Sequence, residues 1–256
     1  LKVRANREIF EILGSFDEHF LDDIGFIKAT SDLVDPARVP GLSKARKSDA
    51  PHAVAAAILS ACRKNAESAE NKAHPSGVAT HARHVVANEV LENRFTFYGE
   101  SHQLRKDFSW DENPGTAHWG HDLNRFSFLT GLTQAHAQTG EDRYARKAID
   151  LMLDWVAKCD IKRCFEGTPY AFGSYLNNTI HCSVWAQCLE TLIPTGIVEP
   201  IELLRILKSL HDQINYLEIV TNGHAGNWPT IGCQGVLATL AALPVFRDQD
   251  RFTSYF

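Results

Sequence analysis

The stretch that decides the fold is residues 118–157, HWGHDLNRFSFLTGLTQAHAQTGEDRYARKAIDLMLDWVA. In its first half, apolar residues recur at steps of three and four, which is the spacing of one helical face. These residues are Leu123, Phe126, Leu129 and Leu132, with Phe128 widening the stripe. The same spacing returns in the second half at Tyr144, Ala148, Leu151, Met152 and Trp155. The sequence therefore predicts two amphipathic helices.

The two helical patterns are separated by a short break that runs from Thr139 to Asp142. Gly140 suits the left-handed conformation that ends many helices. The acidic side chains of Glu141 and Asp142 are favourable near the N-terminal end of the helix that follows. Because so short a connection places consecutive helices side by side in opposite directions, this stretch predicts an antiparallel helical hairpin.

Helical spacing also covers most of the remaining chain. The segments are 4–34, 51–66, about 78–92, 175–193, 200–220 and about 230–243. Polar loops that are rich in aromatic residues lie between some of them, including 93–117, in which Phe95-Thr96-Phe97 suggests an extended piece. There is no glycine-rich phosphate loop and no series of alternating strands. We therefore predict an all-α fold of about eight helices in antiparallel pairs, either an incomplete (α/α) toroid or an irregular α-solenoid.

Length and charge limit the function classes. The chain has 256 residues, which is enough for one large domain over 1–256. Its formal net charge is -5, whereas nucleic-acid binders usually carry a basic stripe, so we expect no nucleic-acid partner. No apolar run reaches the length of a membrane span, and we expect none.

The cysteines show no metal-binding or redox pattern. The chain has 6 of them, none in a CxxC pair, and we predict that most are buried free thiols. A disulfide between Cys159 and Cys164 is the alternative in an oxidising compartment.

Aromatic rings, amides, Arg and His side chains gather on the loops and helix ends. Rings stack on the apolar faces of sugars, while amides and guanidinium groups bind hydroxyls and carboxylates, so this composition is typical of a carbohydrate-binding cleft. The candidates are Trp110, Trp119, Asn124, Arg125, Tyr170, Asn177, Asn178, His181, Trp185, His224, Asn227 and Trp228. The alternative is that Trp119, Trp155 and Trp185 only fill the helical core and that His181 is a core histidine.

Other chemistries have weaker support. His118 and His121 have HxxH spacing, but no cysteine or carboxylate triad accompanies them, so a metal site is disfavoured. A carboxylate pair for glycoside hydrolysis remains open. Its candidates are Asp107, Asp111, Glu112 and Asp122. No GxSxG motif supports acyl transfer.

Several of these motifs together resemble the N-terminal toroid of the heparinase II/III-like polysaccharide lyases. They are Phe95-Thr96-Phe97, Trp110-Asp111, TAHWGHDLNRF…DW over 116–155, and GNWPTIGCQGVLATLAALPVFRD over 226–248. The resemblance covers most of residues 85–248 and is strongest in the central hairpin. It favours the incomplete (α/α) toroid over the solenoid.

The resemblance implies β-elimination on a uronic-acid polysaccharide such as heparan sulfate or alginate, without a cofactor, in a periplasmic or secreted enzyme. Asn227 matches the family's asparagine, which handles the substrate carboxylate. At the position of Trp228 the family often has a His. We name His224 as the residue that would take over the role of that His. Asn227 and His224 are therefore the catalytic candidates.

The resemblance also implies a longer protein. The family's catalytic Tyr and a second His would lie beyond Phe256, the latter in a C-terminal β-sandwich domain. We therefore expect that this chain alone binds acidic polysaccharide weakly and does not catalyse. The alternatives are a non-catalytic carbohydrate-binding helical scaffold and an α/α-toroid glycoside hydrolase.

Overall fold

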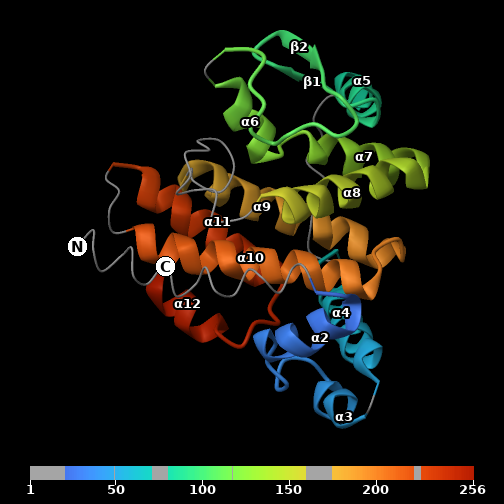
Figure 1. Ribbon diagram of the computed structural model, residues 1–256, viewed down its shortest axis with the longest axis vertical. Helices are drawn as coiled ribbons and strands as arrows, with labels where there is room; N and C mark the ends of the chain where they lie inside the picture. Colours follow the sequence, from blue (N-terminus) through green and yellow to red (C-terminus); the bar gives the residue numbers. More distant parts are fainter. Residues whose placement is uncertain (1–20, 49, 71–79, 117, 160–174, 222–225) are drawn as a thin grey trace.

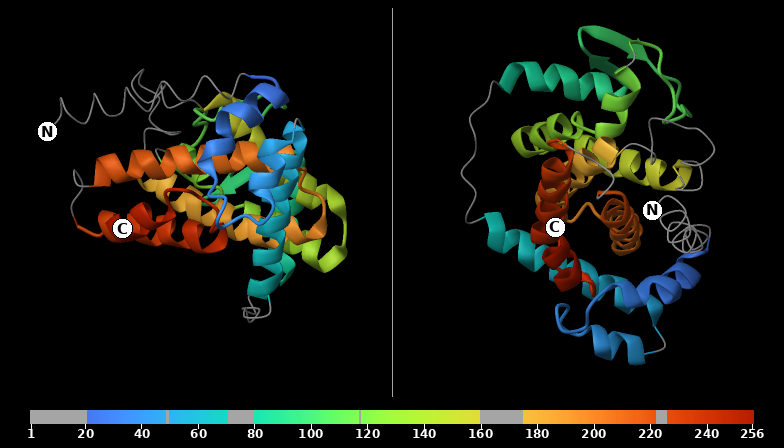
Figure 2. Two further views of the ribbon diagram at one scale, coloured as in Figure 1. Left: turned by 90° about the horizontal axis from the view of Figure 1, so that it is seen from below. Right: turned by 90° about the vertical axis from the view of Figure 1, so that its left-hand side faces the viewer.

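The computed structural model describes residues 21–48, 50–70, 80–116, 118–159, 175–221 and 226–256 (Figure 1). The elements run in the order α2 (Asp23–Thr30), η2 (Ser31–Leu33), α3 (Leu42–Lys47), α4 (Pro51–Glu70), α5 (Thr80–Leu91), β1 (Arg94–Phe97), β2 (Glu100–Gln103), α6 (Trp119–Arg125), α7 (Leu129–Thr139), α8 (Asp142–Lys158), α9 (Tyr175–Leu192), η4 (Ile193–Thr195), α10 (Pro200–Val220), α11 (Trp228–Ala242) and α12 (Gln249–Tyr255). Figure 2 (right) shows α10 nearly end-on, with the other helices arranged around it.

The predicted central hairpin is confirmed as α7 and α8. Gly140 ends α7 with a left-handed φ of 69°, and its N–H donates to the carbonyl of His136 at 2.8 Å. The first helical run is split, however, because Phe126 adopts φ 60° between α6 and α7. That turn brings the Phe126 ring to 4.7 Å from the Trp110 ring, centroid to centroid. Apolar spacing alone did not predict the break, because it continues through this position.

The pairing of α9 with α11 depends on glycines. A Cβ atom on Gly232 would lie 1.9 Å from the hydroxyl of Tyr175, and one on Gly235 would lie 2.3 Å from the Thr179 carbonyl oxygen. No side chain fits in either place, so these positions let the two helices approach closely. The approach fixes how the start of α11 sits beside the start of α9.

The predicted loop 93–117 contains a short hairpin. β1 and β2 pair in antiparallel register, with Phe95 opposite His102. Tyr98 and Gly99 form its turn with positive φ angles of 55° and 79°. The Phe97 ring contacts the ring of Trp119 at a centroid distance of 5.1 Å, so the hairpin packs on α6.

Residues 243–248 return to the beginning of the described chain. Val34 and Phe246 form an isolated antiparallel bridge, and Arg247 N–H donates to the Leu33 carbonyl at 2.9 Å. In Figure 1 this segment runs below α10, next to α2, and continues into α12. We call residues 245–248 the strap. The sequence analysis predicted neither the strap nor α12.

The fold class is confirmed as all-α, with antiparallel helical hairpins of the α/α-toroid type. Cys62, Cys182 and Cys188 are buried free thiols, as expected, and burial raises the pKa of Cys62 and of Cys188 to about 12. Cys164 lies outside the described residues. Within the described helices, none combines the length and apolar character needed to cross a membrane.

Candidate functional site

A buried amide at the start of α9 connects two polar side chains of α6. Asn177 is buried, and its Oδ1 accepts a hydrogen bond from Arg125 Nε at 3.2 Å. Its Nδ2 lies 3.0 Å from Nδ1 of His121. An amide nitrogen only donates, so His121 Nδ1 is the acceptor, and the proton of the neutral ring is on Nε2. Asn177 therefore orients an imidazole and a guanidinium at one place.

The charge on Arg125 is balanced by a carboxylate on the same helix. Nη1 of Arg125 lies 2.8 Å from Oδ1 of Asp122, and the two side chains are 23% and 17% exposed. Burial lowers the pKa of His121, and the nearby positive charge of Arg125 lowers it further. At neutral pH this region thus holds a neutral imidazole beside an ion pair.

The turn of the β-hairpin completes this polar group. Tyr98 is exposed, and a hydrogen bond from its hydroxyl to Asp122 raises the pKa of Tyr98. The ring of His118 lies 6.3 Å from the rings of both Tyr98 and His121. We call the six residues the α6 rim. They are Tyr98, His118, His121, Asp122, Arg125 and Asn177.

The start of α11 presents an aromatic surface on the other side of α9. Trp228 is 40% exposed, and its ring stacks on the ring of Tyr175 at a centroid distance of 6.2 Å and an angle of 6°. The Tyr175 hydroxyl lies 3.2 Å from Oγ1 of Thr221. Asn227 is the exposed residue immediately before α11. The start of α9 therefore lies between the α6 rim and this surface.

Several predicted site residues lie in the core instead. Asn124 donates to the Trp110 carbonyl at 2.7 Å and accepts from Trp155 Nε1 at 3.1 Å. His181 is fully enclosed, with its ring 3.9 Å from that of Trp185, and burial lowers the pKa of His181 well below its ordinary value. Because these side chains are buried, a sugar bound at the protein surface does not contact them.

The remaining tryptophans are also interior. Trp110 is buried and donates from Nε1 to Asp154 at 2.9 Å, and Trp119 is buried and donates to the Glu100 carbonyl at 3.3 Å. Asn178 is likewise buried. Trp119 and Asn227 thus do not face one common surface. The alternative of core-filling rings fits these positions.

Two candidates fall outside the described residues, namely Tyr170 and His224. Of the predicted residues, the structure brings Arg125 and Asn177 together at the α6 rim, and Asn227 and Trp228 at the start of α11. The sequence analysis did not propose Tyr98 or His121 as sugar-binding residues. The spacing of His121 and Arg125, four positions apart on one helix, was the available signal.

Two of the candidate carboxylates for glycoside hydrolysis already have partners. Asp122 is paired with Arg125, whereas Glu112 accepts from the Ser109 N–H at 3.1 Å and lies 3.9 Å from Arg105. Asp107 is exposed. Over the part of the chain that the structure describes, no three His, Cys, Asp or Glu side chains gather in a way that would hold a metal ion.

Comparisons with known proteins agree with this architecture. A family model described as the heparinase II/III N-terminus matches residues 37–255. The solved structure of the heparan sulfate lyase HepC from Pedobacter heparinus has a TM-score of 0.73 at 17% identity, covering 88% of this chain and 37% of that one. A heparinase III structure has a TM-score of 0.64 at 15% identity, covering 87% of this chain and 37% of that one. No curated protein sequence matches the chain.

The identities with the solved structures are low, so these likenesses establish the fold. The chain spans 37% of the length of either structure. The family match extends from the first described loop to the end of α12 and includes both the α6 rim and the start of α11. This chain therefore belongs to the heparinase II/III family, whose N-terminal region it matches, and is related to the polysaccharide lyases.

Proposed function

We propose that this chain is the N-terminal toroid of a lyase that cleaves uronic-acid-containing polysaccharide, of the heparan sulfate or alginate type, by β-elimination. The observation that carries the proposal is the arrangement at the start of α9. Asn177 holds Arg125 and His121 on one side, while Asn227 and Trp228 stand partly or fully exposed on the other. Amide, guanidinium, imidazole and indole groups are those that bind an acidic sugar.

β-Elimination has three chemical requirements. The C5 proton beside a carboxylate is barely acidic, so the negative charge that develops when it leaves must be neutralised. A base takes the C5 proton, the C4–O4 bond breaks, and a C4–C5 double bond forms. An acid then protonates the departing O4. The first requirement is the one that the described residues can meet.

We assign the carboxylate-binding role to Asn227, supported by its exposure at the beginning of α11. Trp228 would stack on a sugar ring, since its own ring is already held parallel to that of Tyr175. Arg125 and His121 would contact hydroxyl or acidic groups of the neighbouring sugar. His224 remains a second catalytic candidate, and the base and acid would come from a Tyr and a His outside this chain.

The buried candidates take a different role in this proposal. Trp110, Asn124, His181 and Trp185 would fix α6, α8 and α9 relative to one another, without touching substrate. We further propose that 1–256 is a single toroid domain, that a C-terminal β-sandwich completes the enzyme, and that the enzyme acts in the periplasm or outside the cell, where such polymers occur.

Binding is the test for this chain. In affinity electrophoresis through gels that contain heparan sulfate, alginate or hyaluronan, Trp228→Ala should weaken retention about fivefold, the loss expected for one stacking contact of about 1 kcal/mol. Leu237→Ala is the matched control, because Leu237 lies on the same helix and is similarly exposed. Equal retention of both variants would refute the role of Trp228.

Chemistry is tested on the full-length enzyme. Asn227→Ala should abolish release of the unsaturated uronate product, whereas Gln234→Ala, an exposed amide on the same helix, should leave it unchanged. A full-length protein that binds these polymers without releasing an unsaturated product would instead be a non-catalytic carbohydrate-binding scaffold.

A further inference from the structure

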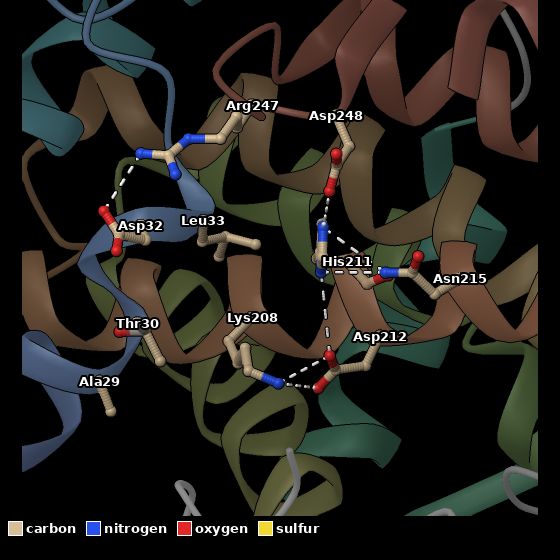
Figure 3. A pocket seen from close by; sticks show the side chains of 10 residues that line it. All are labelled: Ala29, Thr30, Asp32, Leu33, Lys208, His211, Asp212, Asn215, Arg247 and Asp248. Carbon is tan, nitrogen blue, oxygen red and sulfur yellow. Dashed lines mark hydrogen bonds and ion pairs between the residues drawn. The ribbon is translucent and has the colours of Figure 1, made fainter. Parts of the chain in front are cut away.

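A second polar site lies on the opposite side of α10 from the helices that carry the α6 rim (Figure 1). It is a pocket of about 420 Å³ between α2, η2, α10 and the end of the strap (Figure 3). His211 projects from α10 into this region. Its side chain is 17% exposed, and its Nε2 lies 3.1 Å from Oδ2 of Asp248, the residue before α12.

The second ring nitrogen of His211 has two competing neighbours. Nδ1 lies 3.1 Å from the Nδ2 atom of Asn215 and 3.9 Å from Oδ1 of Asp212. A neutral ring accepts from Asn215 at Nδ1 and donates to Asp248 from Nε2. A charged ring has a proton on both nitrogens, so Nδ1 then repels the amide N–H of Asn215 and turns its attraction to Asp212. Proton uptake therefore changes the partner of Nδ1.

Asn215 also joins α10 to α12, and its Nδ2 donates to the backbone carbonyl of His211 at 2.9 Å, a bond that does not depend on the charge of the ring. Its Oδ1 accepts from Arg251 Nη2 at 2.8 Å, and Arg251 also pairs with Glu218 of α10 and lies 3.6 Å from Asp248. The rings of Phe246 and Phe252 pack against the imidazole at centroid distances of 5.8 and 5.6 Å. His211 is thus the centre of the contact between α10, the strap and α12.

The surrounding charge favours the protonated ring. Lys208 pairs with Asp212 at 2.6 Å, with exposures of only 6% and 3%, while Arg247 and Asp32 pair across the pocket at 3.1 Å. Arg46 also lies 3.9 Å from Asp32, and the other charged groups near the imidazole or its partners are Asp248, Glu218 and Arg251. The two carboxylates that lie against the ring itself, those of Asp212 and Asp248, favour the imidazolium.

We propose that His211 is a proton-operated latch that holds the strap and α12 against α10, tighter when the imidazole is charged and looser when it is neutral. The pocket admits water to the ring, so the proton exchanges without unfolding. The latch stands independently of the proposed lyase function, because it rests on contacts of α10, the strap and α12 alone.

The pKa directions give the operating range. Burial by itself lowers the pKa of His211, but the carboxylates of Asp212 and Asp248 outweigh it and raise the pKa above its ordinary value. The hydrogen bond from His211 lowers the pKa of Asp248. The latch is therefore closed between these two folded-state pKa values, and it loosens as the pH rises through that of His211.

The far end of α12 contacts the last turn of α10, which leads to the residues that support Trp228. The Tyr255 hydroxyl donates to the Glu218 carbonyl at 2.6 Å in the last turn of α10. Thr221, directly after α10, contacts the Tyr175 hydroxyl, and Tyr175 carries the stacked ring of Trp228. If the proposed function holds, an open latch would also weaken sugar binding at Trp228.

Hydrogen–deuterium exchange on the whole chain tests the latch. After correction for intrinsic exchange rates, protection of residues 249–255 should fall several-fold between about pH 6 and about pH 8, relative to α8. His211→Gln, which keeps a neutral donor, should remove this pH dependence. His52→Gln, at an exposed position on α4, should retain it. The same dependence in His211→Gln as in the wild type would overturn the proposal.

A second variant keeps the test decisive if His211→Gln folds poorly. Asp248→Asn removes one carboxylate from a partly exposed position. The variant should have a lower His211 pKa, which an NMR titration measures. Its α12 should also be as weakly protected at about pH 6 as the α12 of the wild type is at about pH 8. An unchanged His211 pKa together with unchanged protection would overturn the latch.

Discussion

Two histidines on opposite sides of this molecule have similar local partners and opposite protonation behaviour. His121 on the α6 rim and His211 in the α10 pocket are both partly buried. Nδ1 of His121 lies 3.0 Å from Nδ2 of Asn177, and Nδ1 of His211 lies 3.1 Å from Nδ2 of Asn215. Yet the pKa of His121 is lowered, whereas that of His211 is raised. The asparagine contact that the two histidines share therefore does not explain the difference.

The neighbouring charge does. His121 faces the guanidinium of Arg125, which adds to the effect of burial, whereas His211 lies between the carboxylates of Asp212 and Asp248, which outweigh it. One site therefore presents a neutral imidazole suited to hydrogen-bonding a ligand. The other holds an imidazole between two carboxylates, which favour its charged form.

The α10 pocket and the α6 rim should differ most in how much their ion pairs contribute to the free energy of unfolding. Lys208→Met leaves Asp212 buried without its cation and should cost about 3–5 kcal/mol in the free energy of unfolding. Arg125→Met on the more exposed α6 rim should cost about 1 kcal/mol or less. Urea unfolding of both variants measures this. Equal losses would mean that burial does not distinguish the two sites.

The asparagines should differ next. Asn177→Ala removes a buried amide that serves both Arg125 and His121, so the free energy of unfolding should fall by about 1–3 kcal/mol. Asn215→Ala, at a half-buried position in the α10 pocket, should cost about 1 kcal/mol or less, because water replaces part of the lost bonding. The same urea series reports both values, and a larger loss for Asn215→Ala would contradict this ranking.

The pH dependence of stability should have a different sign for each histidine. A lowered folded-state pKa means that His121, and more strongly His181, take up protons on unfolding, so stability falls as the pH drops below about 6.5. The raised pKa of His211 makes stability fall as the pH rises from about 6.5 through its folded value. Each proton contributes a slope of up to about 1.4 kcal/mol per pH unit.

Unfolding midpoints at a series of pH values measure both branches. His211→Gln should flatten the alkaline branch and leave the acid branch as it is. Loss of the acid branch in that variant would show that the two sites are not electrostatically separate.

The smallest expected effect is on single pKa values. Arg125→Gln should raise the pKa of His121 only part of the way toward its ordinary value, since burial, the largest cause of its shift, remains. The pKa of His211 should stay constant in the same NMR titration. A shift of both would indicate long-range coupling through α9 and α10.

Local patterns in the sequence predicted much of the helical framework. Gly140 predicted the α7–α8 connection, and the helix predicted at 200–220 is α10, whose start has a capping box between Glu199 and Glu202. Both depend on neighbours within a few positions, which is why the residue types suffice. The break at Phe126 depends on a ring from a different loop, so the periodicity of its own helix did not reveal it.

The candidate site was only partly predictable. Arg125, Asn177, Asn227 and Trp228 were named from the sequence as polar or aromatic residues at helix ends, and the structure places them near the start of α9 or of α11; their contact with sugar stays a prediction. Trp110 was chosen by the same reasoning and is buried. A tryptophan in a polar loop has the same composition whether the loop is open or folds onto the helices.

By itself, the sequence determined the all-α class, the central hairpin and the family, because each depends on spacing and residue type along a continuous stretch. Only the tertiary structure decided which rings are core and which are exposed, how Asn177 connects α9 to α6, and how the strap joins Phe246 to Val34. It also decided the opposite directions in which the pKa values of His121 and His211 shift. These properties depend on charges and surfaces that come from distant parts of the chain, and no local pattern records which of them meet.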